Sequence, residues 1–179
     1  MSCIYNLNNI AASCDTNMGG LKGLFVFNYG DAYIDTYDSD GGPEDVVLPD
    51  FSDKSIFYFN SGSNSTLTST VNVDKNNATR YVQTDAQFMF PIQDTDKAKA
   101  INELIQKDLT VLVVDNNNRL YWLGLSEPVY ISAGTAQTGT ARGDGNYYQV
   151  TFTDIAPDYP PVDDAGRGPY DKWMDDLAG

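Results

Sequence analysis

The stretch between residues 81 and 154 constrains the fold most, because strand-like and helical patterns follow one another along it. Residues 81–90 form a run that favours a β-strand. Residues 94–108 are amphipathic, and one face of the expected helix and the residue after it carries Ala98, Ile101, Leu104, Ile105 and Leu109. Three strand-like runs follow, with the sequences TVLVV, RLYWLG and NYYQVTFTD. The order predicts a mainly β fold, an antiparallel β-sandwich or barrel with one flanking α-helix.

The chain before this stretch predicts further strands separated by turns and one long loop. Residues 24–28 and 32–37 are expected to pair as a short hairpin through Tyr29, Gly30 and Asp31. Residues 38–53 are acidic and interrupted by glycine and proline, which predicts a long surface loop. Strands are expected again at residues 56–59 and 66–73.

The strand expected at residues 66–73 has one apolar and one polar face. Leu67, Val71 and Val73 alternate with polar residues and share their face with Ser69, the pattern of a half-buried strand. The same alternation is present in residues 147–154, where Tyr148, Val150 and Phe152 share a face.

The sequence also predicts the ends of the helix and the positions of turns. Asp94 or Thr95 is expected to cap the helix, with Asp96 in its first turn and Lys107 near its C-terminus. Residues 115–118, with the sequence DNNN, predict a hairpin turn because Asn tolerates positive φ. Residues 133–146, rich in Gly and Thr, predict a long projecting loop or hairpin.

The chain is expected to have one domain with an arm at each end. Residues 1–23 form an extended N-terminal segment, residues 24–156 the β domain, and residues 157–179 an acidic, proline-rich C-terminal arm. The arm also carries apolar side chains, which favour docking on another surface, in this subunit or in the next. These side chains are Tyr159, Tyr170, Trp173, Met174 and Leu177.

The net charge of −14 over 179 residues argues against direct binding to nucleic-acid phosphates, which needs clustered Lys and Arg. Two interpretations remain open: the charge keeps the protein soluble, or it forms a surface that repels a polyanion. No apolar run approaches the length that spans a membrane, and the N-terminus lacks the pattern of a secretory signal. We therefore expect folding in a cytoplasm and no membrane partner, with Cys3 and Cys14 as free thiols.

The chain contains no histidine, which removes Ser–His and Cys–His nucleophile pairs. Carboxylate pairs such as Asp35 with Asp38, Glu44 with Asp45, or Asp163 with Asp164 are expected by chance at this acid content. The DNNN turn and residues 38–41 lack the ligand set of a calcium loop. We expect no enzyme, no cofactor and no metal site. A carbohydrate-binding module stays open, because aromatics such as Tyr121 or Trp122 could form a sugar platform if exposed.

Three features resemble the tail-tube (major tail) proteins of tailed bacteriophages and related small virion proteins of gut phages. The first is the N-terminal opening Cys3…Cys14-Asp-Thr-Asn-Met-Gly-Gly. The second is the helix before the hairpin TVLVVDNNNRLYWLG, and the third is the tract Gly134…Gly139-Thr-Ala-Arg-Gly-Asp-Gly-Asn-Tyr-Tyr with its Pro/Asp-rich exit. The resemblance covers most of the chain as an order of elements and short phrases.

The resemblance implies a virion structural protein that assembles with copies of itself and other virion proteins into stacked rings. Strands then line a channel through which DNA passes without specific binding, and an electronegative wall keeps DNA from adhering. Residues 66–73 and 80–90, with Thr, Ser, Asn and Gln on their second faces, are the candidates for this wet lining. Loop 38–53, tract 133–146 with Arg142 and Asp144, and the tail 157–179 become candidate ring-to-ring contacts. Capsid decoration, head–tail joining and fibre attachment remain alternative virion roles.

Overall fold

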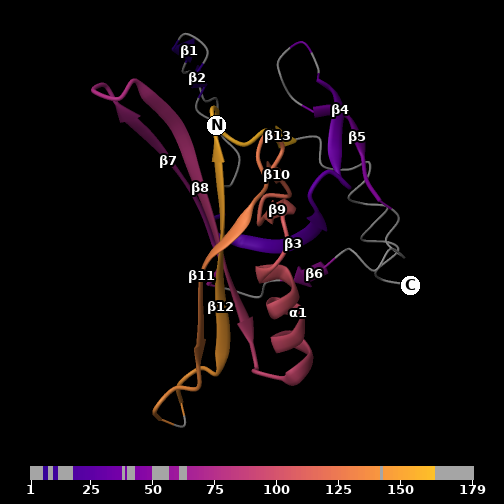
Figure 1. The fold of residues 1–179 in the computed structure, drawn as a ribbon, viewed down its shortest axis with the longest axis vertical. Helices are drawn as coiled ribbons and strands as arrows, with labels where there is room; N and C mark the ends of the chain where they lie inside the picture. Colours follow the sequence, from indigo (N-terminus) through magenta and orange to yellow (C-terminus); the bar gives the residue numbers. More distant parts are fainter. Residues whose placement is uncertain are drawn as a thin grey trace.

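The computed structural model describes residues 6–7, 10–11, 18–37, 39, 43–49, 57–60, 64–141 and 143–163. Over these residues the chain is mainly β with one helix, as the sequence predicts (Figure 1). The strands are β1 (Asn6–Leu7), β2 (Ile10–Ala11), β3 (Leu21–Asn28), β4 (Tyr33–Tyr37), β5 (Pro43–Val47), β6 (Phe57–Asn60), β7 (Thr66–Asp74), β8 (Thr79–Pro91), β9 (Leu109–Asp115), β10 (Leu120–Leu123), β11 (Tyr130–Gln137), β12 (Tyr147–Ala156) and β13 (Val162–Asp163), and the helix is α1 (Thr95–Ile105).

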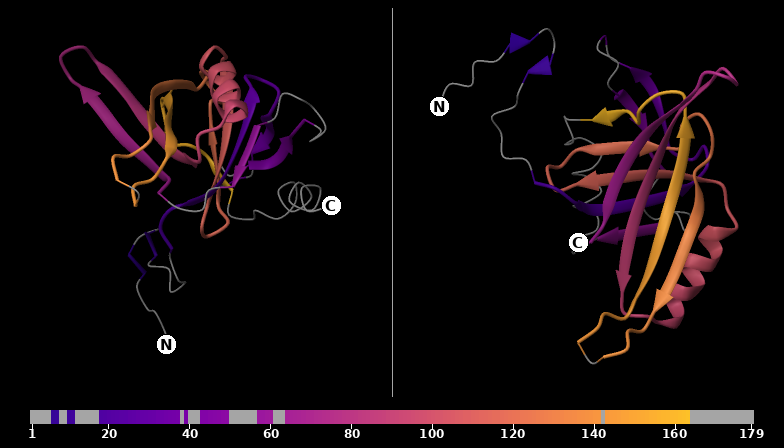
Figure 2. Two further views of the ribbon diagram at one scale, coloured as in Figure 1. Left: turned by 90° about the horizontal axis from the view of Figure 1, so that it is seen from below. Right: turned by 90° about the vertical axis from the view of Figure 1, so that its left-hand side faces the viewer.

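Two antiparallel sheets form the body. Sheet I has five strands in the order β13-β10-β9-β3-β6, and sheet II has four strands in the order β11-β12-β8-β7. The strands of the two sheets run crosswise to each other, as the two views in Figure 2 show. The architecture is therefore a β-sandwich with one flanking helix, which confirms the predicted fold class.

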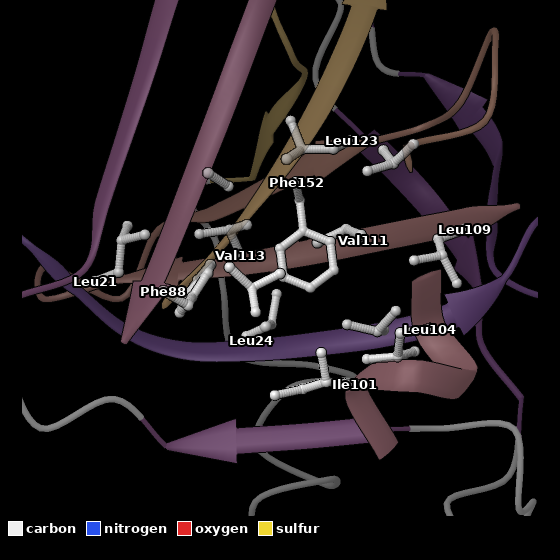
Figure 3. Close-up of a cluster of buried hydrophobic side chains, with 14 of the residues drawn as sticks. Leu21, Leu24, Phe88, Ile101, Leu104, Leu109, Val111, Val113, Leu123 and Phe152 are labelled. Atoms are coloured by element: carbon white, nitrogen blue, oxygen red, sulfur yellow. The ribbon is translucent and has the colours of Figure 1, made fainter. Parts of the chain in front are cut away.

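The main core lies between the two sheets. Sheet I contributes Leu24, Val111 and Val113, and sheet II contributes Phe88 and Phe152, all fully buried (Figure 3). The helix α1 closes one side of this core with Ile101 and Leu104. Because these residues alternate along the sheet II strands, the opposite face of sheet II is left free for polar residues.

A second core covers the other face of sheet I. Phe25, Phe27, Leu112 and Trp122 form it with other buried residues, and Ile34 and Leu48 pack against it. Every residue of β9 is consequently buried. This two-sided burial explains why TVLVV is a continuous apolar run, whereas the sheet II strands alternate.

The prediction that residues 24–28 and 32–37 pair as a hairpin is wrong. β3 pairs with β6 and β9, whereas β4 pairs with β5. The turn at Gly30 is present, with a φ of +86°, but the chain leaves sheet I after it. The predicted loop 38–53 contains β5, since Pro43–Val47 pairs with β4. In the first case long-range pairing overrides the local turn pattern, and in the second a local β4–β5 hairpin forms where glycine and proline predicted a loop.

Two further elements differ in extent from their predictions. The helix is capped by Asp94 as expected, but it ends at Ile105, which is 54% exposed, and Leu109 begins β9 instead of continuing the helical face. Of the two forms predicted for residues 133–146, loop or hairpin, the structure has the hairpin, because β11 continues to Gln137 and pairs with β12. The DNNN turn joins β9 and β10 as predicted. Cys3 and Cys14 lie outside the described residues.

Candidate functional site

The face of sheet II that points away from the core is polar, and we call it the outer face. Register places Thr66, Thr68 and Thr70 of β7 opposite Gln87, Asp85 and Gln83 of β8. β12 adds Gln149, Thr151 and Thr153 to the same face, and β11 adds Thr135 and Gln137. Hydroxyl and amide groups thus predominate on this face, which also carries Met89 and Ile155.

Asp85 is the carboxylate at the middle of the outer face. Its Oδ1 accepts a hydrogen bond of 2.6 Å from the Thr153 hydroxyl, and its Oδ2 accepts one of 3.0 Å from the Gln83 amide. The hydroxyls of Thr153 and Ser132 lie 2.7 Å apart. A shallow hollow of about 400 Å³ surrounds this network, with Tyr130 at its border. The hollow offers hydrogen-bonding groups and one negative charge.

The outer face carries few ionised groups. Along the strands of sheet II, all of which are described, its acidic residues are Asp85 and, at the end of β7, Asp74, and it has no Lys or Arg. The expectation of an electronegative wall therefore rests on Asp85 and not on a dense acidic surface.

Both edges of sheet II are open among the described residues. The edge strands are β7, with the sequence TLTSTVNVD, and β11, with the sequence YISAGTAQ. Neither contains Lys, Arg or Pro, the residues with which soluble proteins commonly protect an edge. β11 has one irregularity between Ile131 and Ala133. Two long edges at opposite sides of one sheet, whose one charged residue is Asp74 at the end of β7, are able to accept further strands.

A groove of about 630 Å³ runs beside the β7 edge. The first half of β7 forms one wall, and Met18–Leu21, Tyr121 and Val162 form the other. Tyr159, one of the predicted assembly contacts, lines this groove and is 62% exposed. The groove joins an open strand edge to an exposed aromatic side chain, a combination that suits an extended polypeptide.

The DNNN turn holds the segment that leads to the N-terminus. The Asn117 side chain accepts a hydrogen bond of 2.9 Å from the Met18 N–H and donates one of 2.9 Å to the Met18 carbonyl. The Asn116 amide donates one of 2.7 Å to the Gly19 carbonyl. Asp115 orders the turn by accepting bonds of 2.8 Å from the N–H groups of Asn117 and Arg119. We call this arrangement the asparagine clamp.

The Tyr121 hydroxyl lies 3.4 Å from the Asp115 carboxylate. Burial, and then the neighbouring Asp115 charge, raise the pKa of Tyr121. The Asp115 carboxylate is thus directed at backbone N–H groups and a phenol, which is the geometry of a structural turn.

The loop between β11 and β12 is ordered around Asp144, another predicted assembly contact. Its carboxylate accepts bonds of 2.7 and 2.8 Å from the N–H groups of Ala141 and Thr140. These bonds hold the pKa of Asp144 below its ordinary value. Gly139, at a φ of +73°, has no space for a side chain because a Cβ would lie 2.3 Å from the Asp144 Cβ. Arg142 lies outside the described residues.

The remaining predicted residues are distributed as follows. Tyr170, Trp173, Met174 and Leu177 lie outside the described residues, so of the predicted assembly contacts only Tyr159 and Asp144 are placed, the first in the groove and the second in the β11–β12 loop. Asp35 is exposed on β4, while Asp38 and Asp164, and the side chains of Glu44, Asp45 and Asp163, are not described. Trp122 is 2% exposed and belongs to the second core, so it cannot serve as a sugar platform.

The identity of the strands at the open edges and the asparagine clamp were not predicted from the sequence. The polar alternation in β7, β8 and β12 indicated the outer face, but which strands lie at the edges depends on sheet order. The bonds from Asn117 to Met18 join positions 99 residues apart, so no local pattern reveals them.

No protein-family model matches the chain, and no curated protein matches it. Within the described residues no helix is long and apolar enough to cross a membrane, and no group of three or more acidic, Cys or His side chains is placed to hold a metal ion.

Proposed function

We propose that this chain is a virion structural protein, the tail-tube subunit of a tailed bacteriophage, which joins copies of itself into stacked rings around a DNA-conducting channel. The observation that carries the proposal is sheet II, which combines two open edges free of Lys, Arg and Pro with a polar outer face. The resemblance in the order of sequence elements supports the same class.

The two edges differ in sequence, which determines how copies would join. Pairing β7 of one copy with β11 of the next is a head-to-tail contact, and such contacts close into rings when the rotation between neighbours permits. Each copy then extends the sheet of its neighbour, and the edge that would otherwise cause aggregation becomes an assembly contact. A ring built in this way presents one continuous sheet face to its centre.

The outer face suits the wall of such a channel. Hydroxyl and amide side chains bind water well, and they do not form the charge-assisted bonds to phosphate that Lys and Arg form. Asp85 adds one negative charge per copy near the middle of the wall. DNA would therefore meet a hydrated sheet face that carries no Lys or Arg.

Charged substitutions on the edges test the proposal. Thr70→Lys on β7 and Thr135→Lys on β11 place cations on exposed residues of the two edge strands. Like charges across a strand pair disfavour pairing, by about 0.2–1 kcal/mol for each direct pair. We expect wild-type protein to form rings or tubes in native mass measurements and negative-stain microscopy, and the double variant to remain monomeric with an unchanged melting temperature.

Asn102→Lys is the matched control, because it adds a cation to the exposed surface of α1, away from both edges. It should assemble as the wild type does. A wild-type protein that stays monomeric or trimeric at high concentration would contradict the tail-tube role. A trimer would favour capsid decoration, head–tail joining or fibre attachment instead.

Carbohydrate binding is the second candidate, favoured by the hollow around Asp85. Tyr130, 46% exposed, borders this hollow beside Gln87 and Ser132, and stacking on an aromatic with hydrogen bonds to hydroxyls is how sugars are held. Glycan-array binding by a monomer, lost in Tyr130→Ala, would favour this candidate over the tail tube.

A further inference from the structure

Ile92 combines backbone strain with exposure. It has a φ of +64°, a conformation that β-branched residues rarely adopt, and its side chain is 67% exposed. The other non-glycine residues with positive φ in the described chain are Asn64, Ala78 and Asn118, which are small or tolerate this conformation. A link between a strand and a helix needs neither a branched nor an apolar side chain. The connection between β8 and α1 therefore does not explain why isoleucine occupies position 92.

Backbone contacts hold Ile92 in this conformation. Its N–H donates a hydrogen bond of 2.8 Å to the Asn146 carbonyl, and its carbonyl accepts one of 3.1 Å from the Lys97 ammonium group. Lys97 in turn pairs with Asp94, the cap of α1, at 2.6 Å. On the Ile92 side these contacts use the backbone, while the residue remains 67% exposed.

The opposite end of the molecule carries two exposed aliphatic side chains, beside the exposed Arg80 that lies opposite Val73 in the β7–β8 hairpin. Figure 1 shows the hairpin of β7 and β8 reaching beyond sheet I at one end of the long axis, while the far end of β8 leads to α1 at the other end. On this hairpin Val71 and Val73 share the face of the core residues, yet they are 46% and 55% exposed. Sheet I does not extend far enough to cover them.

We propose that Ile92 of one copy packs against Val71 and Val73 of a second copy, joining successive rings along the tube axis. This inference rests on the proposed function. The contact joins opposite ends of the molecule, so it repeats without closing and produces a stack. Three aliphatic side chains bury far less than the roughly 800 Å² per partner of a stable two-chain interface. The contact therefore acts only when a ring repeats it many times at once.

The test uses the purified full chain under conditions in which wild-type rings form. Ile92→Asn removes the apolar side chain and supplies a residue that tolerates positive φ. We expect the subunit to melt at an equal or higher temperature, and rings to form normally. The concentration at which rings stack into tubes should rise at least tenfold. Val73→Thr should produce the same stacking defect, and the double variant should be no worse than either single variant, because the two residues share one contact.

Ile105→Gln is the control, since it removes another isoleucine, 54% exposed, from the last residue of α1. Its tubes should match those of the wild type. Ile92→Asn rings that stack as wild-type rings do would overturn this inference and leave the tail-tube proposal standing. A lower melting temperature for Ile92→Asn would also overturn it, since the side chain would then serve the subunit itself. If the wild type forms no ring, both proposals fall.

Discussion

Asp154 is a buried carboxyl group whose ionisation the fold opposes. It is 4% exposed on the core side of β12, and its carboxylate accepts hydrogen bonds from the N–H groups of Gly124 and Ile155. Burial raises the pKa of Asp154 above its ordinary value in spite of these bonds. The folded state thus binds a proton more readily at this site than the unfolded state does.

The pH dependence of stability follows from this direction. A carboxyl group with a raised pKa stabilises the fold fully below its ordinary pKa of 3.8, and this contribution is lost as the pH rises through the raised value. The Asp154→Asn side chain cannot ionise. The free energy of unfolding of this variant should therefore rise relative to that of the wild type between pH 3 and about pH 7, which means that the variant becomes relatively more stable.

Chemical denaturation at a series of pH values measures this difference. Asp35→Asn, at an exposed site on β4, controls for the loss of one negative charge. Its difference from wild type should change far less with pH than that of Asp154→Asn. Equal pH slopes for the two variants would show that burial of Asp154 is not the cause.

At the scale of elements, the asparagine clamp decides where the N-terminal segment leaves the body. Asn117→Ala removes both side-chain bonds to Met18 while Asp115 still orders the turn. We expect a loss of about 1 kcal/mol in the free energy of unfolding, the usual net value of a hydrogen bond or two. The larger effect should be local, with faster hydrogen exchange at the Met18 N–H and faster proteolysis before residue 21.

Asn102→Ala, on the exposed surface of α1, provides the comparison for this prediction. It should leave exchange at Met18 unchanged. If Asn117→Ala also leaves exchange and proteolysis unchanged, the clamp does not fix the N-terminal segment.

Elements with strong periodicity were predictable from the sequence, and sheet order was not. The alternation in β8 and β12 and the continuous apolar run in β9 follow from how many faces of each strand are buried. The pairing of β3 with β9 and β6 depends on contacts across more than 30 residues, for which a turn such as that at Gly30 gives no information. Hence the expected hairpin at residues 24–37 was wrong although both of its strands exist.

The candidate site was predictable in its chemistry but not in its position. Threonine and glutamine at alternate positions of β7 and β8 indicate a wetted face from the sequence alone. That β7 and β11 are the edges of the sheet, and that Val71 and Val73 lie beyond the cover of sheet I, follow only from the three-dimensional arrangement. Strain at Ile92 has no sequence signal, because the surrounding contacts impose it.

At the scale of the whole molecule, the net charge of −14 is distributed unevenly. The outer face of sheet II holds Asp85 and, at its end, Asp74, so most of the acidic residues lie on other parts of the chain. In a ring, the charge at the wall of the channel would then be set by Asp85, repeated once per copy. A lysine at this one position would place one cation per copy at the middle of the channel wall.

Asp85→Lys tests this consequence in assembled tubes. Wild-type tubes should not retain duplex DNA at about 0.15 M salt, whereas Asp85→Lys tubes should retain it through ionic contacts with phosphates. Retention should fall steeply as salt rises, with a slope of roughly −0.9 per phosphate contact in a plot of log affinity against log salt concentration. Asp85→Asn, which removes the charge and keeps the shape, should assemble and retain little DNA. Gel filtration of labelled DNA with tubes of verified length measures all three proteins, and equal retention by Asp85→Lys and Asp85→Asn tubes would show that the outer face of sheet II does not line the channel.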